Sequence, residues 1–198
     1  MKRLLGCCLL LGAAGCGTGS HLSDEQILTV LELRLGQWQF DFRGGPSGVT
    51  PTRQVGQSVG RWTEQGRAIE VVGHKKSRSE TVPYYMTRTF DRALGAFVDR
   101  VQIRGQILTR HCLWSPPTRT LTIQAIDPPL AASIKMDHRV VFDSALASLT
   151  GSSSVDDSGT EVSFWSWRGK RTGPMDNVRF EKLFAAFEKH QASVNAAK

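Results

Sequence analysis

Cysteine is almost absent from the body of this chain. Three of the four cysteines lie within the first sixteen residues, and only Cys112 lies beyond them. A single cysteine cannot form an internal disulfide, so packing and hydrogen bonding must hold the body together. No cluster of cysteine and histidine has the spacing of a zinc site. Because Cys112 falls in a strand-like run, we predict that it is a small core residue and not a catalytic thiol.

The chain also lacks a hydrophobic run long enough to form a membrane-spanning helix. Its main apolar run, Leu4–Ala14, follows two basic residues and is much shorter than the ~20 residues that a span requires. A short apolar run behind a basic start is typical of a secretory signal peptide. The run ends in Ala13-Ala14-Gly15-Cys16, which resembles the lipobox of bacterial lipoproteins, with alanine at the place where leucine is usual.

This resemblance implies that residues 1–15 are a signal peptide and that Cys16 is lipidated. Ordinary signal cleavage after Gly15 is the alternative, because small residues suit that cut as well. Each buried lipid methylene contributes ~0.8 kcal/mol, so two or more acyl chains would hold the protein stably at a bilayer. Residues 16–22 would then be a short tether. The membrane is the expected partner, and the expected location is the cell envelope, facing the periplasm or the exterior.

The chain is basic, but its charge is not gathered into a stripe. The formal net charge is +7 at pH 7, and the basic residues are spread along the sequence. Nucleic-acid-binding domains cluster their basic residues on one face with interleaved aromatic side chains. The sequence therefore argues against a nucleic-acid partner. It favours a solvated surface, one with some attraction to anionic lipid.

The remaining length fits one domain, predicted at residues 23–191, with a frayed tail at 192–198. Ser23 and Gln26 have the pattern of a capping box, which predicts a short helix at the start of the domain. A second helix is predicted near the end, where four apolar residues fall at helical spacing: Phe180, Leu183, Phe184 and Phe187. This stripe is expected to pack on the outside of a sheet, and a helix lying on the membrane surface is the alternative.

Between the two helices the sequence alternates apolar and polar residues, which is typical of β-strands. Segments 44–48 and 151–159 are rich in glycine and serine and are predicted to be loops. Short connections favour an antiparallel meander, and closing it into an up-and-down barrel removes the edge strands. We therefore predict a mainly β fold with eight or nine strands: 37–43, 54–63, 67–74, 84–90, 96–103, 107–115, 119–126, 136–142 and 161–168.

The opening Leu35-Gly36-Gln37-Trp38 resembles the lipocalin and calycin families, in which a short helix leads into a Gly-x-Trp motif. The hairpin motifs at 62–67 and 90–95 are similar to those of a bacterial group of calycin-like domains of unknown function. In these families the tryptophan closes the barrel floor and packs against an arginine near the end of the last strand. The resemblance therefore implies a floor made of Gly36, Trp38 and Arg168. It implies a fold and no established activity.

One motif suggests an enzyme at first sight. Gly56-Gln57-Ser58-Val59-Gly60 matches the Gly-x-Ser-x-Gly nucleophile elbow of α/β-hydrolases. That elbow requires a strand, a sharp turn and a helix, so that the serine is exposed above the start of the helix. Here the sequence continues as a strand and a turn. We therefore assign no catalytic role to Ser58.

The predicted hairpins place charged residues on an inward, apolar face. Pairing 84–90 with 96–103 sets Arg88 opposite Asp99, close enough to interact across the strands. A charged pair on such a face is costly to desolvate unless it is well hydrogen-bonded or faces a solvated cavity. The same pairing makes an apolar wall of Tyr84, Met86, Phe90, Phe97, Val101 and Ile103.

Two histidines are expected to share that interior. The hairpin at Pro116-Pro117 is predicted to set Leu113 against Leu121, which points His111 inward, and His138 shares a face with Val140. Apolar walls with a few convergent polar groups describe a ligand pocket. The candidate ligand-binding residues are Tyr84, Met86, Arg88, Phe97, Asp99, His111 and His138.

These residues support three functional hypotheses. The first is an envelope lipoprotein whose lipocalin-like barrel binds a small hydrophobic or amphipathic molecule. The second is a non-enzymatic structural or interaction module, which a filled barrel would indicate. The third is an enzyme, a hydrolase or isomerase that uses the inward polar cluster. A metal or haem iron bound by the two histidines and a carboxylate is a further alternative. We assign no catalytic residue, metal or cofactor, and nothing in the sequence indicates the oligomeric state.

Overall fold

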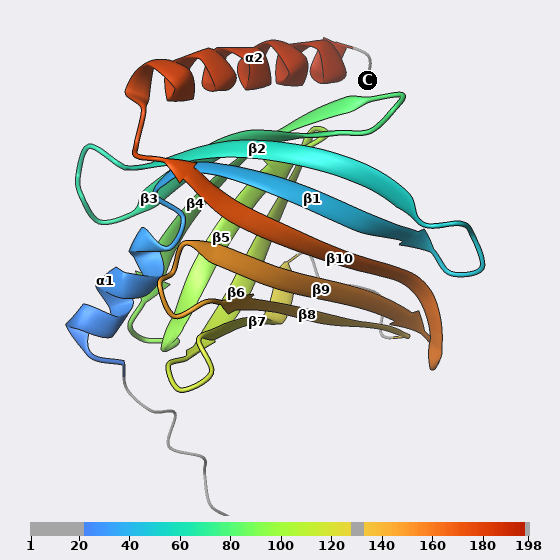
Figure 1. The fold of residues 1–198 in the computed structure, drawn as a ribbon, viewed down its shortest axis with the longest axis horizontal. Coiled ribbons are helices and arrows are strands. Elements are labelled where there is room, and N and C mark those ends of the chain that lie inside the picture. Colours follow the sequence, from blue (N-terminus) through green and yellow to red (C-terminus); the bar gives the residue numbers. More distant parts are fainter. Residues whose placement is uncertain (1–21, 128–132, 197–198) are drawn as a thin grey trace, which may run out of the picture.

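A computed structural model describes residues 22–127 and 133–196. Within them, ten antiparallel strands form a closed barrel with one helix before the strands and one after them (Figure 1). The predicted signal peptide and Cys16 lie outside the described residues. In chain order the elements are α1 (Asp24–Glu32), β1 (Gly36–Pro46), β2 (Thr52–Trp62), β3 (Ile69–Lys76), β4 (Thr81–Asp91), β5 (Ala96–Ile103), β6 (Gln106–Ser115), β7 (Thr120–Asp127), β8 (Ile134–Phe142), β9 (Ser148–Asp157), β10 (Thr160–Gly173) and α2 (Asn177–Ala196).

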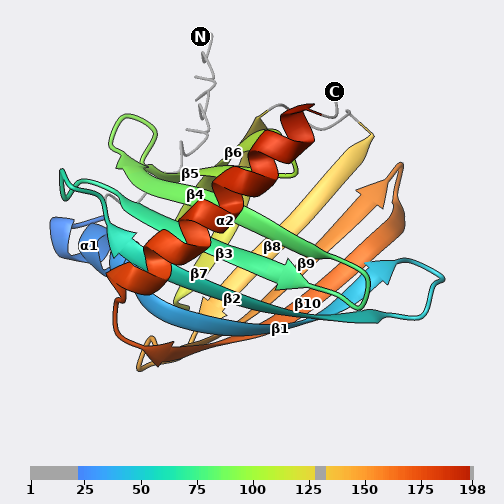
Figure 2. The same ribbon diagram turned by 90° about the horizontal axis from the view of Figure 1, so that it is seen from above.

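The mainly β, up-and-down barrel with two flanking helices is confirmed. Each strand pairs with its neighbours in sequence, and β1 closes the barrel by pairing with both β2 and β10. The connections are short enough that consecutive strands lie side by side around the wall (Figure 2). Among the described strands, closure gives every strand a partner on both sides, which limits the exposed strand edges.

The strand that the sequence analysis missed is β9. It contains Gly151–Ser154, a segment predicted to be a loop. Small polar residues supply no apolar alternation, so the usual strand pattern is missing. The strand is held instead by backbone pairing to β8 on one side and β10 on the other. Gly151 also lets the Trp167 ring lie against β9, because a Cβ at this position would come within 2.1 Å of that ring.

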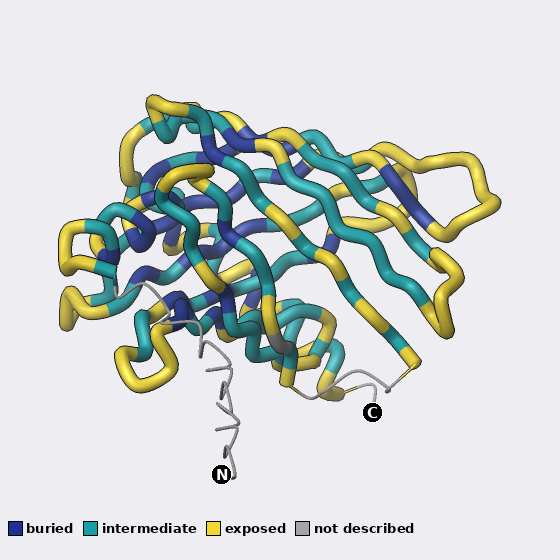
Figure 3. The backbone as a smooth tube through the Cα atoms, turned by 90° about the horizontal axis from the view of Figure 1, so that it is seen from below, coloured by how far each residue is buried: buried dark blue, intermediate teal, exposed yellow. Residues whose placement is uncertain are grey.

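The floor of the barrel lies at the end covered by α1. Ser23 forms the predicted capping box with Gln26, and the apolar face of the helix packs on the core through Ile27, Val30 and Leu31. Trp38 is 1% exposed and lies in the same core. Figure 3 shows most of the buried positions toward this end of the barrel. The densely packed core therefore lies at the floor, and the barrel interior above the floor lies outside it.

One residue of the predicted barrel floor, Arg168, does not pack on Trp38, so that part of the prediction is wrong. The arginine over the Trp38 ring is Arg171, at 5.3 Å from the ring centroid, and Arg168 is exposed on the outside of the barrel. Side chains alternate along β10, and Arg168 pairs with the outward residue Asp41, whereas Arg171 pairs with Trp38 itself. Gly36 has φ +85°, and a Cβ there would lie 2.6 Å from the carbonyl oxygen of Gly173, so glycine is required where β1 begins.

Helix α2 lies across the outside of β2, β3 and β4, as predicted (Figure 2). Phe180 and Phe187 are buried against Val59 and Val72. The Arg61 guanidinium stacks on the Phe180 ring at 3.8 Å. The helix continues to Ala196, so most of the segment predicted to fray is helical. Among the described residues, neither helix is long and apolar enough to cross a membrane.

The wall is least continuous between β7 and β8. Among the described residues of these strands, pairing is limited to Thr120–Val141, Leu121–Val140 and Thr122–Arg139, near the floor. Every other neighbouring pair of strands shares at least seven residue pairs. The barrel therefore has one weakly paired line along its wall, on the side where His138 lies.

Candidate functional site

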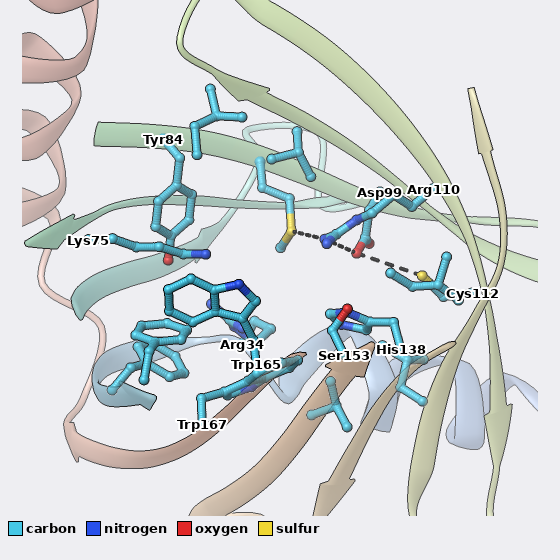
Figure 4. Close-up of a pocket in the computed structure, with 18 of the residues that line it drawn as sticks. Arg34, Lys75, Tyr84, Asp99, Arg110, Cys112, His138, Ser153, Trp165 and Trp167 are labelled. Carbon is cyan, nitrogen blue, oxygen red and sulfur yellow. Dashed lines mark hydrogen bonds and ion pairs between the residues drawn. The ribbon is translucent and has the colours of Figure 1, made fainter. Parts of the chain in front are cut away.

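A cavity of about 340 Å³ occupies the barrel interior above the floor. Its walls are largely apolar and aromatic, and Figure 4 shows Trp165 and Trp167 beside the polar residues of the cavity. Its size is within the range of small-molecule sites, ~300–1,000 Å³. The apolar part of the lining consists of Phe40, Phe42, Met86, Val101, Ile103, Leu121, Ile123, Val140, Trp165 and Trp167.

Arg88 and Asp99 form the cross-strand pair that the hairpin register predicts. Arg88 Nε and Nη2 donate to the two carboxylate oxygens of Asp99 at 2.6 and 2.9 Å. The side chains are only 5% and 1% exposed. Arg110 donates a third hydrogen bond to Asp99, at 2.9 Å. A fork of this kind both orients the carboxylate and offsets the cost of burying it.

Asp99 is held in its charged form. Burial alone would raise its pKa, but Arg88, and then Arg110 and Arg34, outweigh burial and lower the pKa to about 2. The carboxylate is therefore charged at any physiological pH. It neutralises one of the guanidinium groups around it.

Cys112 lies next to this pair and is inert. Its thiol is 3.8 Å from Asp99 Oδ2. Burial, together with the negative charge of Asp99, raises the pKa of Cys112 to about 12. Because the thiolate is the nucleophilic form, this cysteine is a core residue at the edge of the cavity, in line with the sequence.

His138 points into the cavity as predicted. Its ring lies 5.0 Å from that of Trp167. Burial, and then the positive charge of Arg110, lowers its pKa to about 3. The imidazole is therefore neutral, and it can give or accept a hydrogen bond without adding charge. Among the described residues, no group of three or more His, Cys, Asp and Glu side chains could hold a metal ion.

Two further cations enter the cavity, and the sequence analysis assigned neither. Arg34 comes from the link between α1 and β1; its Nη2 lies 3.5 Å from Ser58 Oγ, and its guanidinium lies 5.1 Å from the Phe40 ring centroid. Lys75 lies on β3 with Nζ 4.8 Å from the centroid of the Phe42 ring. Burial lowers the pKa of both groups.

The cavity therefore holds an excess of positive charge. Arg34, Lys75, Arg88 and Arg110 line it, and Asp99 is the only acidic residue of the lining in the part of the chain that the structure describes. Three of the guanidinium nitrogens are buried without a hydrogen-bond partner within the described part of the chain: Nε of Arg34, Nη1 of Arg88 and Nε of Arg110. Buried donors without partners are rare in proteins.

Most of the predicted site residues meet at this cavity. Tyr84, Met86, Arg88, Asp99 and His138 all line it. Phe97 is fully buried in the core and does not reach the lining. The interior positions on β4 and β5 therefore follow the predicted pairing of those strands.

His111, unlike Phe97, does not face the interior at all, and its predicted position is wrong. The hairpin between β6 and β7 pairs Trp114 with Leu121, one residue away from the predicted pairing of Leu113 with Leu121. A shift of one residue reverses the face of every side chain on a strand. Leu113 is therefore 41% exposed, and His111 does not line the cavity.

Arg110 and Cys112 occupy the inward positions instead, and a signal for them is present in the sequence. The turn between β5 and β6 is Arg104-Gly105, and both residues have positive φ, as in a two-residue type I′ turn. Counting outward from that turn pairs Asp99 with Arg110. Trp165 and Trp167 could be found from their alternation with Ser166, but Arg34 follows a helix end and has no such pattern.

Comparisons with known proteins support the architecture and leave the chemistry open. No family model and no curated protein sequence matches this chain. Rv2717c from M. tuberculosis is similar in structure, with a TM-score of 0.55 at 13% identity, over 74% of this chain and 97% of that one. The S-type phycobiliprotein lyase CPES from Guillardia theta has a TM-score of 0.51 at 8% identity, over 74% and 92%. At such identities the likeness concerns the fold alone, a lipocalin- or calycin-like barrel.

Proposed function

We propose that this protein is an envelope lipoprotein whose barrel binds a small hydrophobic or amphipathic molecule. The observation that carries the proposal is the cavity of about 340 Å³ inside the barrel, with apolar walls and a few convergent polar groups. Walls of this kind take up apolar surface, and the polar groups fix the orientation of a ligand. A filled interior would have favoured the interaction module instead.

The polar groups fit binding better than catalysis. Cys112 stays protonated, and Ser58 lies within the continuous strand β2, where no nucleophile elbow can form. Arg88 donates two hydrogen bonds to Asp99, and Arg110 donates a third. The Cys112 thiol is within hydrogen-bond reach of Asp99, but a carboxylate whose pKa is about 2 is too weak a base to activate a nucleophile.

The test introduces a large side chain into the cavity from one strand of its wall. Ser153 is a small residue on β9 that lines the cavity beside His138 (Figure 4). Ser153→Trp should place a large side chain in the lumen and exclude a ligand. The matched control is Ser154→Trp, on the same strand with its side chain on the other face.

The measurement is native mass spectrometry of full-length protein purified from its own membranes. We expect the wild type and Ser154→Trp to carry an additional small-molecule mass, and Ser153→Trp to have lost it. Circular dichroism checks that both variants are folded. If the wild type carries no additional mass, or if Ser153→Trp retains it, the barrel is not the binding site and the proposal fails.

A further inference from the structure

The cavity contains more buried positive charge than its own residues neutralise. Arg88 is engaged with Asp99 through both carboxylate oxygens, and Arg110 shares that carboxylate. Among the described residues, neither Arg34 nor Lys75 forms an ion pair with an acidic side chain. Charge that is partly removed from water without a counter-charge is costly, so an arrangement of this kind calls for an anion.

The hydrogen-bonding capacity points the same way. Nε of Arg34, Nη1 of Arg88 and Nε of Arg110 are buried donors without acceptors. Lys75 contributes further N–H groups, and its Nζ lies over the face of the Phe42 ring. All these groups are donors and none can accept. A ligand that satisfied them would have to bring acceptor oxygens and a negative charge.

The position of these donors sets where the anion would lie. Figure 4 shows Lys75 reaching in beside Tyr84, and Arg110 with Asp99 on the opposite side of the cavity. Lys75 lies close enough to Arg34 and Arg110 that both lower its pKa, after burial. The apolar lining of Val101, Ile103 and Ile123 adjoins them. The space between these cationic groups therefore suits an acidic group, and the apolar lining suits a hydrocarbon.

We propose that the barrel selects amphipathic anions, which place a carboxylate or phosphate among Arg34, Lys75 and Arg110 and an apolar tail against the aromatic and aliphatic walls. This inference rests on the proposed function and narrows it to a class of ligand. It adds a role for Arg34, Lys75 and Arg110, which the sequence analysis did not assign to the site.

The experiment compares four probes that share one tail and differ in the head group: decanoate, decyl phosphate, decanol and decylamine. Binding is followed by isothermal titration calorimetry and by tryptophan fluorescence, because Trp165 and Trp167 line the cavity. We expect decanoate or decyl phosphate to bind at least about tenfold more tightly than decanol, the gain from one charge-assisted hydrogen bond or more. Decylamine should bind more weakly than decanol. The tighter of the two anions identifies the head group.

The variant pair is Lys75→Met and Lys76→Met. Lys75 faces the cavity and makes no hydrogen bond that its loss would break, whereas its neighbour Lys76 is exposed on the outside. Lys75→Met should lower the affinity for the preferred anion about tenfold and leave decanol binding unchanged. Lys76→Met should change neither. Equal losses for anion and alcohol in Lys75→Met would mean that the lysine has only a structural role, and would overturn the proposal.

The remaining outcomes separate this inference from the proposed function. If decanol binds as tightly as both anions, the preference for an acidic head is wrong, although the barrel still binds apolar molecules. If inorganic phosphate alone binds as tightly as decyl phosphate, head and tail are not recognised together, and the inference fails. If none of the four probes binds and the native protein carries no additional mass, the proposed function fails as well.

Discussion

At the scale of single residues, the interior depends on one carboxylate. Asp99 accepts hydrogen bonds from Arg88 and Arg110 and is 1% exposed. Breaking a buried pair by removing one partner is much more costly than replacing both, because one charge stays behind without compensation. Asp99 is thus the residue that makes a lining rich in arginine compatible with a folded barrel.

The pH dependence of stability should reveal this carboxylate. Its pKa falls from the ordinary 3.8 to about 2 in the folded protein. A group whose pKa is lowered by folding stabilises the protein above the unfolded-state pKa, and this contribution disappears as the pH falls through the folded-state pKa. We therefore expect the free energy of unfolding to drop by about 2 kcal/mol between pH 4 and pH 2 on account of Asp99.

Urea unfolding at a series of pH values measures this drop. In Asp99→Asn the free energy of unfolding should fall less steeply between pH 4 and pH 2, because the contribution of Asp99 is gone. The variant should also be less stable than the wild type at pH 7. Asp137→Asn, at an exposed position on β8, is the control and should leave the slope unchanged. An unchanged slope in Asp99→Asn would contradict the role assigned to the Arg88–Asp99 pair.

At the scale of elements, the sequence predicts the strands in which apolar and polar residues alternate, and it misses the strand that lacks this alternation. The pairing of β4 with β5 follows from alternation and turn residues, and it places Arg88 opposite Asp99 as found. The predicted pairing of β6 with β7 is wrong by one residue because it centres the turn on Pro116 and Pro117. The bulge at His111 and Cys112 then changes the register again within the strand. Register depends on turn geometry, which composition alone does not fix.

The glycines and serines of β9 illustrate the same limit. A strand made of small polar residues is stable here because its neighbours supply the packing. Gly151 leaves space for the Trp167 ring, which in turn packs on Phe42 at 6.2 Å between ring centroids. In a single sequence such a strand looks like a loop, because the apolar surface that it contacts belongs to another element.

Gly151→Val tests this account of β9. Valine favours strands, so strand propensity alone predicts a gain in stability. The structure predicts the opposite, because a Cβ at this position would lie 2.1 Å from the Trp167 ring. We expect a loss of about 1–3 kcal/mol, typical of overpacking, with altered tryptophan fluorescence. The control is Ser152→Val, the adjacent residue on the other face of the strand. Urea unfolding that shows equal effects for both variants would contradict the close packing.

At the scale of the whole molecule, the barrel concentrates its specialised parts at different places. The dense core and α1 close one end, α2 covers the outside of β2 to β4, and the cavity lies between the floor and the far end. The weak pairing of β7 with β8 leaves the wall least supported beside His138. Local opening is easiest where fewest backbone hydrogen bonds must break, so in the binding proposal this line is the expected path of a ligand into the lumen.

The proposed attachment to a membrane also belongs to the whole molecule. In the proposal, attachment depends on the lipid at Cys16, in the Ala13-Ala14-Gly15-Cys16 motif. Burial of two or more acyl chains gives stable anchoring, at ~0.8 kcal/mol per methylene. Cys16→Ser should therefore abolish labelling with a radioactive or clickable fatty acid and move the protein from the detergent phase to the aqueous phase.

Cys112→Ser is the matched control, since that thiol is buried in the barrel, and labelling should persist. A Cys16→Ser protein that partitions like the wild type would show that the membrane is reached in another way, while leaving the binding proposal for the barrel untouched.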